Sequence, residues 1–353
     1  MINPSSESRK SQDKEVPFPS CNDKILWELW LSRLHFPALV VADRLKLFSL
    51  LNDRPSNTIE IAESLSISTR GAEALLGVLV GLGFVQQLEE RFFITEVSRE
   101  FLLPESPYYW GGVFRAFRKQ SDRHSPERLL EALHEDTSVN RQRITFEWDS
   151  NSLTDEQARL ITGHIHGHSF PSAMGFARRA DFDGVLRLLD IGGGSGCFSI
   201  AAALHQPNLS CTVVDLQPVC IQAESIIREY NLCDRIEVYA ANFFRDPWPD
   251  GHNAVLLSNI LHDWEWERCQ LLLQKAFNAL PPGGRVFIHE VLLNDGRDAS
   301  LMATSFSLQM VLGTHGKQFT ASEISELLNS AGFINIRFIN SFGYFWTVTA
   351  DKL

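Results

Sequence analysis

The sequence predicts an α/β protein, in which helices cover both faces of a parallel sheet and a mostly helical domain precedes it. Two observations support this fold class. From Leu186 onward, short apolar runs alternate with helical segments, which is the pattern of βαβ units. Over residues 25–48, apolar side chains instead recur at spacings of three and four, as they do on the buried face of a helix.

The composition is that of a globular protein with an ample core. Hydrophobic residues make up 44% of the 353 residues, and the formal net charge is -11. Nucleic acid is not expected as a partner, because neutralising phosphates requires clustered Lys and Arg. The six cysteines are scattered without a CxxC pair. This favours reduced thiols in a cytoplasmic protein over a zinc site or a disulfide framework.

The N-terminus begins with a polar stretch, residues 1–20, which we expect to be a disordered lead-in because it lacks the apolar segment of a signal peptide. No apolar run reaches the ~18–20 residues of a membrane span. Over residues 25–48 the apolar spacing predicts a helix. Its apolar surface exceeds one helix face, so two interpretations stay open: ordinary core, or a surface covered by a partner subunit.

Residues 21–105 predict a winged-helix-like domain. Helices are expected over 59–65 and 69–82, followed by a hairpin over 85–95. Winged helices often bind DNA, but the second helix carries Arg70 and Glu73 and is otherwise almost wholly apolar. A helix that reads DNA needs polar side chains for base edges and phosphates. A packing or dimerisation module is therefore favoured.

Residues 106–180 predict a helical linker. Within it, "HIHGHS" (164–169) places His164 and His168 four residues apart on one helix face, which is the spacing of a metal-binding pair. No acidic residue accompanies the two histidines as it does in HExxH. Histidines that bind no metal are therefore the favoured interpretation of this segment.

The C-terminal domain, residues 181–353, contains the strand patterns of the sheet. Strands are expected within "VLRLLDI", "CTVVDL", "RIEVYAA", "NAVLLSNI" and "GRVFIHEVLL". Two late strands, "INIRFIN" and "YFWTVTA", lie close together and predict an antiparallel hairpin at the sheet edge. Ligands of such sheets bind beyond the carboxyl ends of the strands, so the loops that follow the strands form the candidate site.

The stretch "LLDIGGGSGCF" (188–198) is the main ligand-binding signal. Four glycines fall within five positions after Asp190, and Gly192, Gly194 and Gly196 among them stand at alternate positions. Asp215 ends the next strand, where it would bind ribose hydroxyls. Cys197 replaces the third glycine of a dinucleotide-binding loop, which disfavours a dehydrogenase, and no Lys follows as in a P-loop. An acidic residue before the glycines suits a cofactor with a cationic amino-acid end.

Six motifs together resemble those of the small-molecule O-methyltransferases that use S-adenosylmethionine: "DIGGGSG", "VVDL", "NFFRDPWP", "LSNILHDW", "LPPGGRVFIHE" and "SLQMVLGTHGKQFTASEISELLNSAGF". This family includes plant caffeate and flavonoid enzymes, animal hydroxyindole O-methyltransferase and bacterial enzymes that tailor polyketides. The resemblance covers residues 25–353. It implies a Rossmann-like class I methyltransferase domain with a seven-stranded sheet over 181–353. It also implies a dimerisation domain over 21–105 and substrate-pocket residues within 106–180.

The resemblance makes His262, in "LSNILHDW", the general base that removes the proton of an acceptor hydroxyl. A phenol has a pKa of about 10, and an imidazole that titrates near neutrality suits this task. Glu290 matches one of the acidic residues that flank the base in plant members. Gln318 replaces a second glutamate, so it can hydrogen-bond the imidazole without stabilising its cation. Asp263 either caps the next helix or helps to orient the site.

The resemblance also implies residues that bind the methyl donor and the acceptor. Those for S-adenosylmethionine are Ser169, Asp190, Gly192, Gly193, Gly194, Asp215, Leu216, Asn242, Phe243 and Ser258. Those for the acceptor are Trp148, Phe170, Met174, Asn259, Phe306, Gln309 and Met310. The aromatic and Met side chains among them are either ordinary core or, if they line the pocket, suited to a flat aromatic or apolar acceptor. Asn242 replaces the aspartate that reaches toward adenine in other members, and its amide can still accept a hydrogen bond.

A metal is not expected, but one alternative stays open. His315 stands where an acidic or non-ligating residue would be expected. If the loops that carry His262 and His315 converge, the two imidazoles would hold a divalent metal against a chelating acceptor. A histidine that only makes hydrogen bonds is the simpler interpretation.

The sequence therefore predicts a homodimeric O-methyltransferase that acts on a hydroxyl of an aromatic or polyketide-like small molecule, without a nucleic-acid or membrane partner. Two alternatives stay open. In the first, a methyltransferase of the same fold methylates carbon or nitrogen instead of oxygen, as Gln318 and His315 suggest. The second is a winged-helix regulator, which the acidic charge and the apolar second helix disfavour.

Overall fold

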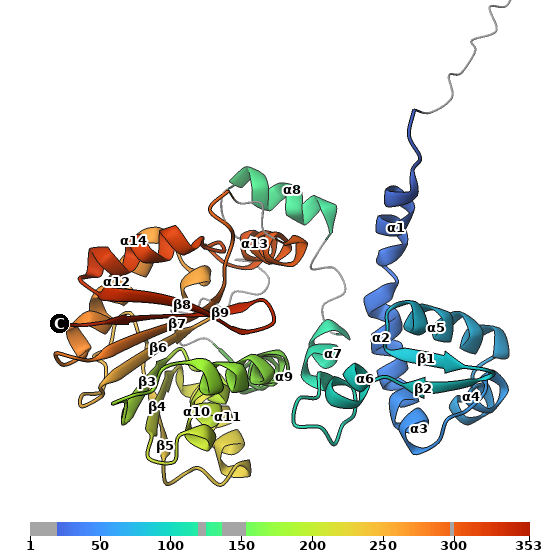
Figure 1. The fold of residues 1–353 in the computed structure, drawn as a ribbon, viewed down its shortest axis with the longest axis horizontal. Coiled ribbons are helices and arrows are strands. Elements are labelled where there is room, and N and C mark those ends of the chain that lie inside the picture. Colours follow the sequence, from blue (N-terminus) through green and yellow to red (C-terminus); the bar gives the residue numbers. More distant parts are fainter. Residues whose placement is uncertain (1–19, 119–124, 136–152, 297–299) are drawn as a thin grey trace, which may run out of the picture. The chain divides into compact units, whose positions relative to one another are not determined.

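The computed structural model describes residues 20–118, 125–135, 153–296 and 300–353 (Figure 1). Residues 1–19 of the predicted lead-in therefore lie outside the described residues. The chain divides into two compact units, with the boundary between Ser98 and Arg99. The first unit contains the winged-helix-like part, and the second contains the sheet.

The first unit contains the two helices and the hairpin expected for a winged helix, which confirms these elements. Its helices and strands are α1 (Lys24–Ser32), α2 (His35–Arg44), α3 (Leu47–Asp53), α4 (Thr58–Leu65), α5 (Thr69–Gly81), β1 (Val85–Leu88) and β2 (Arg91–Ile94). α4 begins with a capping box: Asn57 accepts the N–H of Glu60 at 2.9 Å, and the Glu60 carboxylate accepts that of Asn57 at 2.9 Å. This reciprocal pair fixes the start of the helix.

The single helix predicted over residues 25–48 is wrong, because α1, α2 and part of α3 divide this stretch. Pro37 has no amide hydrogen, so a continuous helix would lose the hydrogen bond to the carbonyl of Arg33 and would press the proline ring against it. The chain accordingly turns after α1, and α2 starts beyond the turn. Lys46 adopts left-handed backbone with φ of 60°, which separates α2 from α3.

The first helix, α1, buries none of its side chains, although most of them are apolar. Ile25 is 73% exposed, Leu29 70% and Trp30 50%. The stretch Lys24–Arg44 is also long and apolar enough to cross a membrane by length and composition alone, which was not expected from the sequence. Exposed apolar surface of this extent is typical of an interaction site.

A seven-stranded sheet forms the centre of the second unit, which confirms the predicted fold class (Figure 1). In spatial order its strands are β5 (Ile236–Ala240), β4 (Ser210–Asp215), β3 (Arg187–Ile191), β6 (Ala254–Ser258), β7 (Arg285–Val291), β9 (Phe345–Asp351) and β8 (Ile334–Phe342). The first five are parallel to one another. The antiparallel hairpin of β8 and β9 lies at the edge as predicted, with β9 paired to β7.

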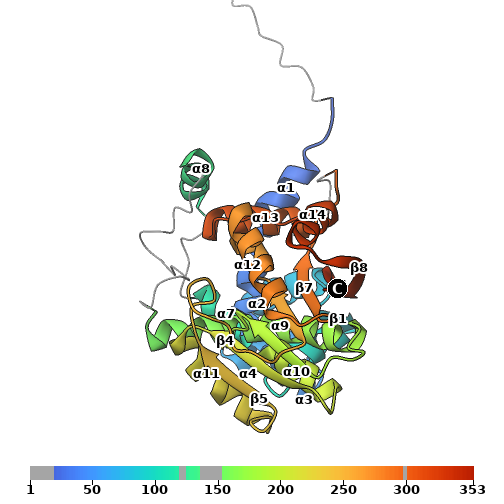
Figure 2. The same cartoon turned by 90° about the vertical axis from the view of Figure 1, so that its left-hand side faces the viewer.

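Helices cover both faces of this sheet (Figure 2). The remaining helices are α6 (Glu96–Phe101), which crosses the unit boundary, α7 (Gly111–Arg118), α8 (Pro126–Glu135), α9 (Asp155–Arg179), α10 (Cys197–His205), α11 (Gln217–Glu229), α12 (Trp266–Ala279), α13 (Leu301–Gly313) and α14 (Ala321–Ala331). Phe287 of β7 packs with residues of α9, α10 and α11, whereas its neighbour Ile288 packs with residues of α12 and α14. This alternation is that of a strand buried on both faces.

Candidate active site

The parallel strands bring the predicted site residues to one edge of the sheet. The glycine loop follows β3, Asp215 ends β4 and Asn242 follows β5. His262 follows β6, and Glu290 lies near the end of β7. Because the carboxyl ends of parallel strands lie at the same edge, residues far apart in the sequence form one candidate site.

The glycine loop after β3 leaves no room for a side chain at Gly192 or at Gly193. Gly192 has φ of 66°, and a Cβ added there would lie 2.4 Å from Cδ1 of Ile260. A Cβ added at Gly193 would lie 2.8 Å from Cγ of Asp190. The N–H of Gly192 donates to the carbonyl of Val214 at 2.8 Å, which ties the loop to β4. The loop therefore offers bare backbone for the close approach of a ligand.

Two buried aspartates hold the glycine loop. Asp215 accepts the N–H of Gly194 at 2.9 Å and that of Leu216 at 2.7 Å, and burial raises its pKa to about 6. Asp190, only 1% exposed, accepts the hydroxyl hydrogen of Ser199 at 2.7 Å. Burial raises the pKa of Asp190 to about 7, with Ser199 opposing the shift and Asp215 adding to it. Asp190 thus supports the loop from within, and Asp215 retains lone pairs for a ligand.

A tight turn follows β5 beside the glycine loop. The Oδ1 atom of Asn242 accepts the N–H of Phe244 at 3.0 Å, and the N–H of Asn242 donates to the carboxylate of Asp246 at 2.7 Å. The amide oxygen that was predicted to face adenine is thus engaged by the turn itself. Phe243 is buried, and its Cε1 lies 3.4 Å from the position of a Cβ on Gly192. The turn therefore packs directly against the glycine loop.

His262 is buried in a short 3-10 helix, Leu261–Asp263, directly after β6. Its Nδ1 lies 2.8 Å from Oε2 of Glu290, and its backbone N–H donates to Oε1 of the same carboxylate at 3.4 Å. Because a carboxylate only accepts hydrogen bonds, Nδ1 carries a hydrogen. In the neutral imidazole the Nε2 lone pair is then available to take a proton.

Asp263 and Gln318 also contact the imidazole. Oδ1 of Asp263 lies 3.7 Å from Nε2 of His262, and the N-cap residue of α12 is Glu265, which makes no side-chain cap. Asp263 therefore faces the site and does not cap that helix. Gln318 is fully buried, with its amide nitrogen 3.2 Å from Nδ1 of His262. Because Nδ1–H donates to Glu290, the amide nitrogen cannot donate to Nδ1, so Gln318 contacts the imidazole without a hydrogen bond and without a charge.

The electrostatics of this cluster favour the protonated imidazole. Burial lowers the pKa of His262, but the carboxylates of Glu290 and Asp263 outweigh it and raise the pKa to about 9. Burial raises the pKa of Asp263 to about 6, with His262 opposing the shift and Glu290 adding to it. The pKa of His262 therefore lies above the value near 7 that was expected for the base. Asp263 supplies the second carboxylate that Gln318 does not.

The segment after α13 passes directly beside His262. The N–H of His315 donates to the carbonyl of Asp263 at 3.2 Å, so the two loops converge as the metal alternative required. A Cβ added at Gly316 would lie 2.2 Å from the carbonyl oxygen of His262, so this close approach requires glycine. Among the residues that the structure describes, no group of three or more His, Cys, Asp and Glu side chains is placed to hold a metal ion.

The "HIHGHS" segment lies in α9 and contacts the glycine loop. The rings of His164 and His168 have centroids 4.8 Å apart, which confirms that they share a face. Nδ1 of His166 lies 3.3 Å from the hydroxyl of Ser195 in the loop, and Nδ1 of His168 lies 3.0 Å from the hydroxyl of Ser169. Burial lowers the pKa of His166 to about 4 and that of His168 to about 3, so both are neutral at pH 7.

Some of the residues predicted to bind the acceptor lie near the base. The ring centroid of Phe306 lies 5.3 Å from that of His262, edge to face, and Gln309 and Met310 follow one turn later on α13. Asn259, at the end of β6, has left-handed backbone with φ of 51°. Its buried Oδ1 accepts no hydrogen bond from any residue that the structure describes. Strained backbone and an unsatisfied buried acceptor are both typical of ligand sites.

Three other predicted site residues make contacts that do not involve His262: Phe170, Ser258 and Met174. Phe170 packs in the core, with its ring centroid 5.4 Å from that of Tyr230. Ser258, predicted to bind the donor, has its hydroxyl 3.3 Å from Nδ1 of His289. Met174 lines a cavity of about 870 Å³ between α9 and the hairpin of β8 and β9. Trp148 lies outside the described residues.

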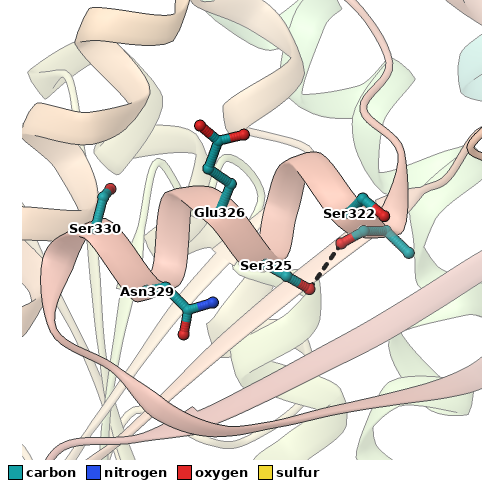
Figure 3. Close-up of a pocket in the computed structure, with 6 residues that line it drawn as sticks. Ser322, Ser325, Glu326, Asn329 and Ser330 are labelled. Carbon is teal, nitrogen blue, oxygen red and sulfur yellow. Dashed lines mark hydrogen bonds between the residues drawn. The ribbon is translucent and has the colours of Figure 1, made fainter.

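A second cavity, of about 640 Å³, lies along α14 (Figure 3). Its labelled side chains all come from this one helix: Ser322, Ser325, Glu326, Asn329 and Ser330. The Ser325 hydroxyl donates to the carbonyl of Ala321 at 2.9 Å and is thus satisfied within the helix. Neither cavity includes His262 in its lining. The candidate site therefore rests on the loops at the sheet edge.

Sequence reasoning missed two residues at this edge. The Lys275 ammonium on α12 donates to the carbonyl of Phe243 at 2.7 Å, and Gly316 permits the close approach to His262. Neither carries a sequence signal. A lysine in an amphipathic helix is usually solvated, and a loop glycine matches many turns.

Comparison with known proteins confirms the predicted family. Residues 150–334 match the O-methyltransferase domain, and residues 27–104 match the O-methyltransferase dimerisation domain. A 3-hydroxy-5-methyl-1-naphthoate 3-O-methyltransferase of Streptomyces sahachiroi is 35% identical over 305 residues, covering 85% of this chain and 86% of its own. The N,N-dimethyltransferase OxyT of Streptomyces rimosus is 29% identical over 277 residues, covering 78% and 80%.

Among solved structures, human N-acetylserotonin methyltransferase in complex with SAM has the same fold. Its TM-score is 0.80 at 23% identity, and the match covers 95% of this chain and 99% of the human chain. The two matched domains together account for both units of the structure described above. The chain belongs to the O-methyltransferase family, with a dimerisation domain followed by the O-methyltransferase domain.

Proposed function

We propose that the protein transfers a methyl group from S-adenosylmethionine to a hydroxyl of an aromatic or polyketide-like small molecule. The observation that carries this proposal is the hydrogen-bonded pair of His262 and Glu290 at the sheet edge that also holds the glycine loop. The Streptomyces sahachiroi relative, named as a naphthoate 3-O-methyltransferase, supports an aromatic hydroxyl as the acceptor.

The residues at this edge fit S-adenosylmethionine. The donor supplies a methyl group on a sulfonium, so the protein needs only to hold both molecules and to accept a proton. The bare backbone of Gly192 and Gly193 would approach the amino-acid part, because a side chain at either position would collide with Ile260 or Asp190 and displace the loop. Asp215 would bind the ribose hydroxyls, and the turn that begins at Asn242 would bound the adenine.

His262 accepts the proton of the acceptor hydroxyl in this mechanism. Its Nδ1–H donates to Glu290, which fixes the ring and leaves Nε2 as the basic atom. The carboxylates of Glu290 and Asp263 stabilise the imidazolium that forms. With a pKa of about 9, only about one His262 in a hundred is neutral at pH 7. The base therefore works best in weakly alkaline solution.

Incubation with labelled S-adenosylmethionine and a matched pair, a naphthol and the corresponding naphthylamine, tests the proposed reaction. We expect a labelled methyl ether from the naphthol, identified by mass and by the position of the methyl group. The amine is included because one relative is named as an N,N-dimethyltransferase. Methyl transfer to nitrogen or to ring carbon, with none to oxygen, would contradict the proposal.

The pH dependence tests the two carboxylates around the base. We expect kcat/KM to rise with pH through about 9, because His262 must be neutral and its pKa lies there. Glu290→Gln removes a carboxylate that raises this pKa, so the rising limb shifts to lower pH while the plateau rate falls through loss of orientation. Asp263→Asn shifts the limb in the same direction. Profiles of both variants from about pH 6 to 10 check this, and an unshifted limb in Glu290→Gln would show that the carboxylate does not tune the base.

We further propose that the enzyme works as a homodimer in the cytoplasm. The match to a dimerisation domain supports the dimer, and the exposed apolar residues of α1 offer a surface for the partner subunit to cover. All six cysteines are free thiols, which favours a reducing compartment. Light scattering should give twice the chain mass of 39.9 kDa.

A further inference from the structure

The turn after β5, residues 242–246, lies against both the end of β4 and the glycine loop that follows β3. The residue before it, Ala241, donates its N–H to the carbonyl of Asp215 at 2.9 Å. Within it, the ring of Phe243 lies against Gly192, where a Cβ would be 3.4 Å from Cε1. A shift of this turn would therefore disturb both the aspartate that ends β4 and the glycine that follows β3.

Two side chains of α12 contact the turn: Lys275 hydrogen-bonds its backbone, and Arg268 places its guanidinium 5.0 Å from the ring centroid of Phe244. The ammonium of Lys275 donates to the carbonyl oxygens of Phe243 at 2.7 Å, Phe244 at 3.2 Å and Asp246 at 3.0 Å. A lysine ammonium has three hydrogens, so these three carbonyls use all of them. Its nitrogen also lies 5.3 Å from the ring centroid of Trp248. Hydrogen bonds to a charged donor are stronger than neutral ones.

We infer that Lys275 is a positioning residue for the methyl donor, acting through the turn from Asn242 to Asp246. It does not touch the reacting atoms. Three carbonyls that bind one cation fix the backbone of the turn. This backbone then holds the Phe243 ring against the glycine loop. The inference rests on the proposed function in one respect: the donor must bind at the glycine loop.

Loss of the ammonium is expected to weaken donor binding and to leave the acceptor side unchanged. In Lys275→Met the side chain keeps its length but loses all three donors, so the carbonyls of Phe244 and Asp246 turn toward water. The carbonyl of Phe243 keeps the indole N–H of Trp248 at 2.8 Å, and the Phe243 ring is held less firmly. We expect the Kd for S-adenosylmethionine to rise about tenfold. The KM for the acceptor and kcat at saturating donor should stay within about twofold of the wild type.

Lys352→Met is the matched control. The ammonium of Lys352 also donates to backbone carbonyls, those of Phe277 and Leu280, both at 2.6 Å, and it lies 4.6 Å from the ring centroid of Phe277. Both lysines thus donate to backbone carbonyls and lie near an aromatic ring. Lys275 binds the turn beside the glycine loop, whereas Lys352 binds the C-terminal end of α12. We expect Lys352→Met to lower Tm without changing the Kd of the donor.

Calorimetry with S-adenosylmethionine alone, together with Tm and steady-state kinetics, tests the inference on the full-length protein. A donor Kd that rises in Lys275→Met but not in Lys352→Met supports it, and Lys275→Arg should restore part of the affinity. An unchanged donor Kd in Lys275→Met, or equal rises in both variants, would overturn it. If Lys275→Met does not fold, an unchanged Kd in Lys275→Gln would overturn it equally. Failure of the wild type to bind the donor would instead refute the proposed function.

Discussion

Replacing His262 with alanine is expected to lower kcat toward a phenol by about 10²–10⁴-fold, the range typical of a lost general base. The imidazole is buried, is held by Glu290 at 2.8 Å, and has Nε2 as its basic atom. Its removal takes away the group that accepts the proton while the glycine loop stays intact. The Kd of S-adenosylmethionine should therefore stay within about twofold of the wild-type value.

His252→Ala is the control for this experiment, because both histidines are 4% exposed. His252 contacts the Thr212 hydroxyl at 2.8 Å and the carbonyl of Pro249 at 3.1 Å, and neither partner is a predicted site residue. We expect its loss to lower stability and to leave kcat of the folded enzyme close to that of the wild type. Equal losses of kcat in the two variants would mean that His262 acts only through packing.

Gly192→Ala is expected to have the second largest effect, a loss of donor binding of at least about 100-fold. Two causes add: the residue has φ of 66°, and the new Cβ would lie 2.4 Å from Cδ1 of Ile260. The left-handed backbone costs about 1–2 kcal/mol for a residue other than glycine. The collision must then move either Ile260 or the loop. Calorimetry with S-adenosylmethionine measures the outcome.

Gly283→Ala is the control for backbone strain outside the glycine loop. Gly283 has φ of 78°, but a Cβ added there would meet no atom within 4 Å. The control therefore carries the same backbone strain without the collision, and it should lower Tm with little change in donor affinity. Donor binding that survives in Gly192→Ala would contradict the assignment of the glycine loop as the donor site.

The sheet was predictable from the sequence because its strands are short apolar runs bounded by polar loops. The pairing of β9 with β7, by contrast, is a tertiary contact that no local pattern encodes. The prediction of one helix over residues 25–48 was wrong for a local reason that the sequence itself contains. Pro37 cannot donate to the carbonyl of Arg33, so the apolar spacing continues through a stretch that the chain divides among three helices.

In the candidate site, the pairing of His262 with Glu290 was predictable from the family resemblance, and the structure shows it. The orientation of Asp263 was not, because a residue after a strand can cap the next helix or face the sheet edge. A 3-10 turn decides it here by placing the carboxylate 3.7 Å from Nε2. The pKa of His262 followed from that placement, since it depends on how many carboxylates face the imidazole.

The contact of the Asn242 amide was not predictable from the sequence either. The sequence offers an amide in place of an acid, but only the three-dimensional turn shows that its oxygen accepts the N–H of Phe244. Lys275 is the reverse case, a residue with no sequence signal and three backbone partners in the structure. Contacts between side chain and backbone of distant segments are the part of a site that spacing does not reveal.

The most direct test of His262 as the proton acceptor is the rate loss in His262→Ala measured across phenols of decreasing pKa. A phenol with a pKa of about 10 needs a base, whereas one with a pKa of about 7 is largely ionised in weakly alkaline buffer. The loss in kcat should therefore be large for the first phenol and shrink toward about twofold for the second. A loss of the same size for every phenol would show that His262 holds the site together without accepting the proton.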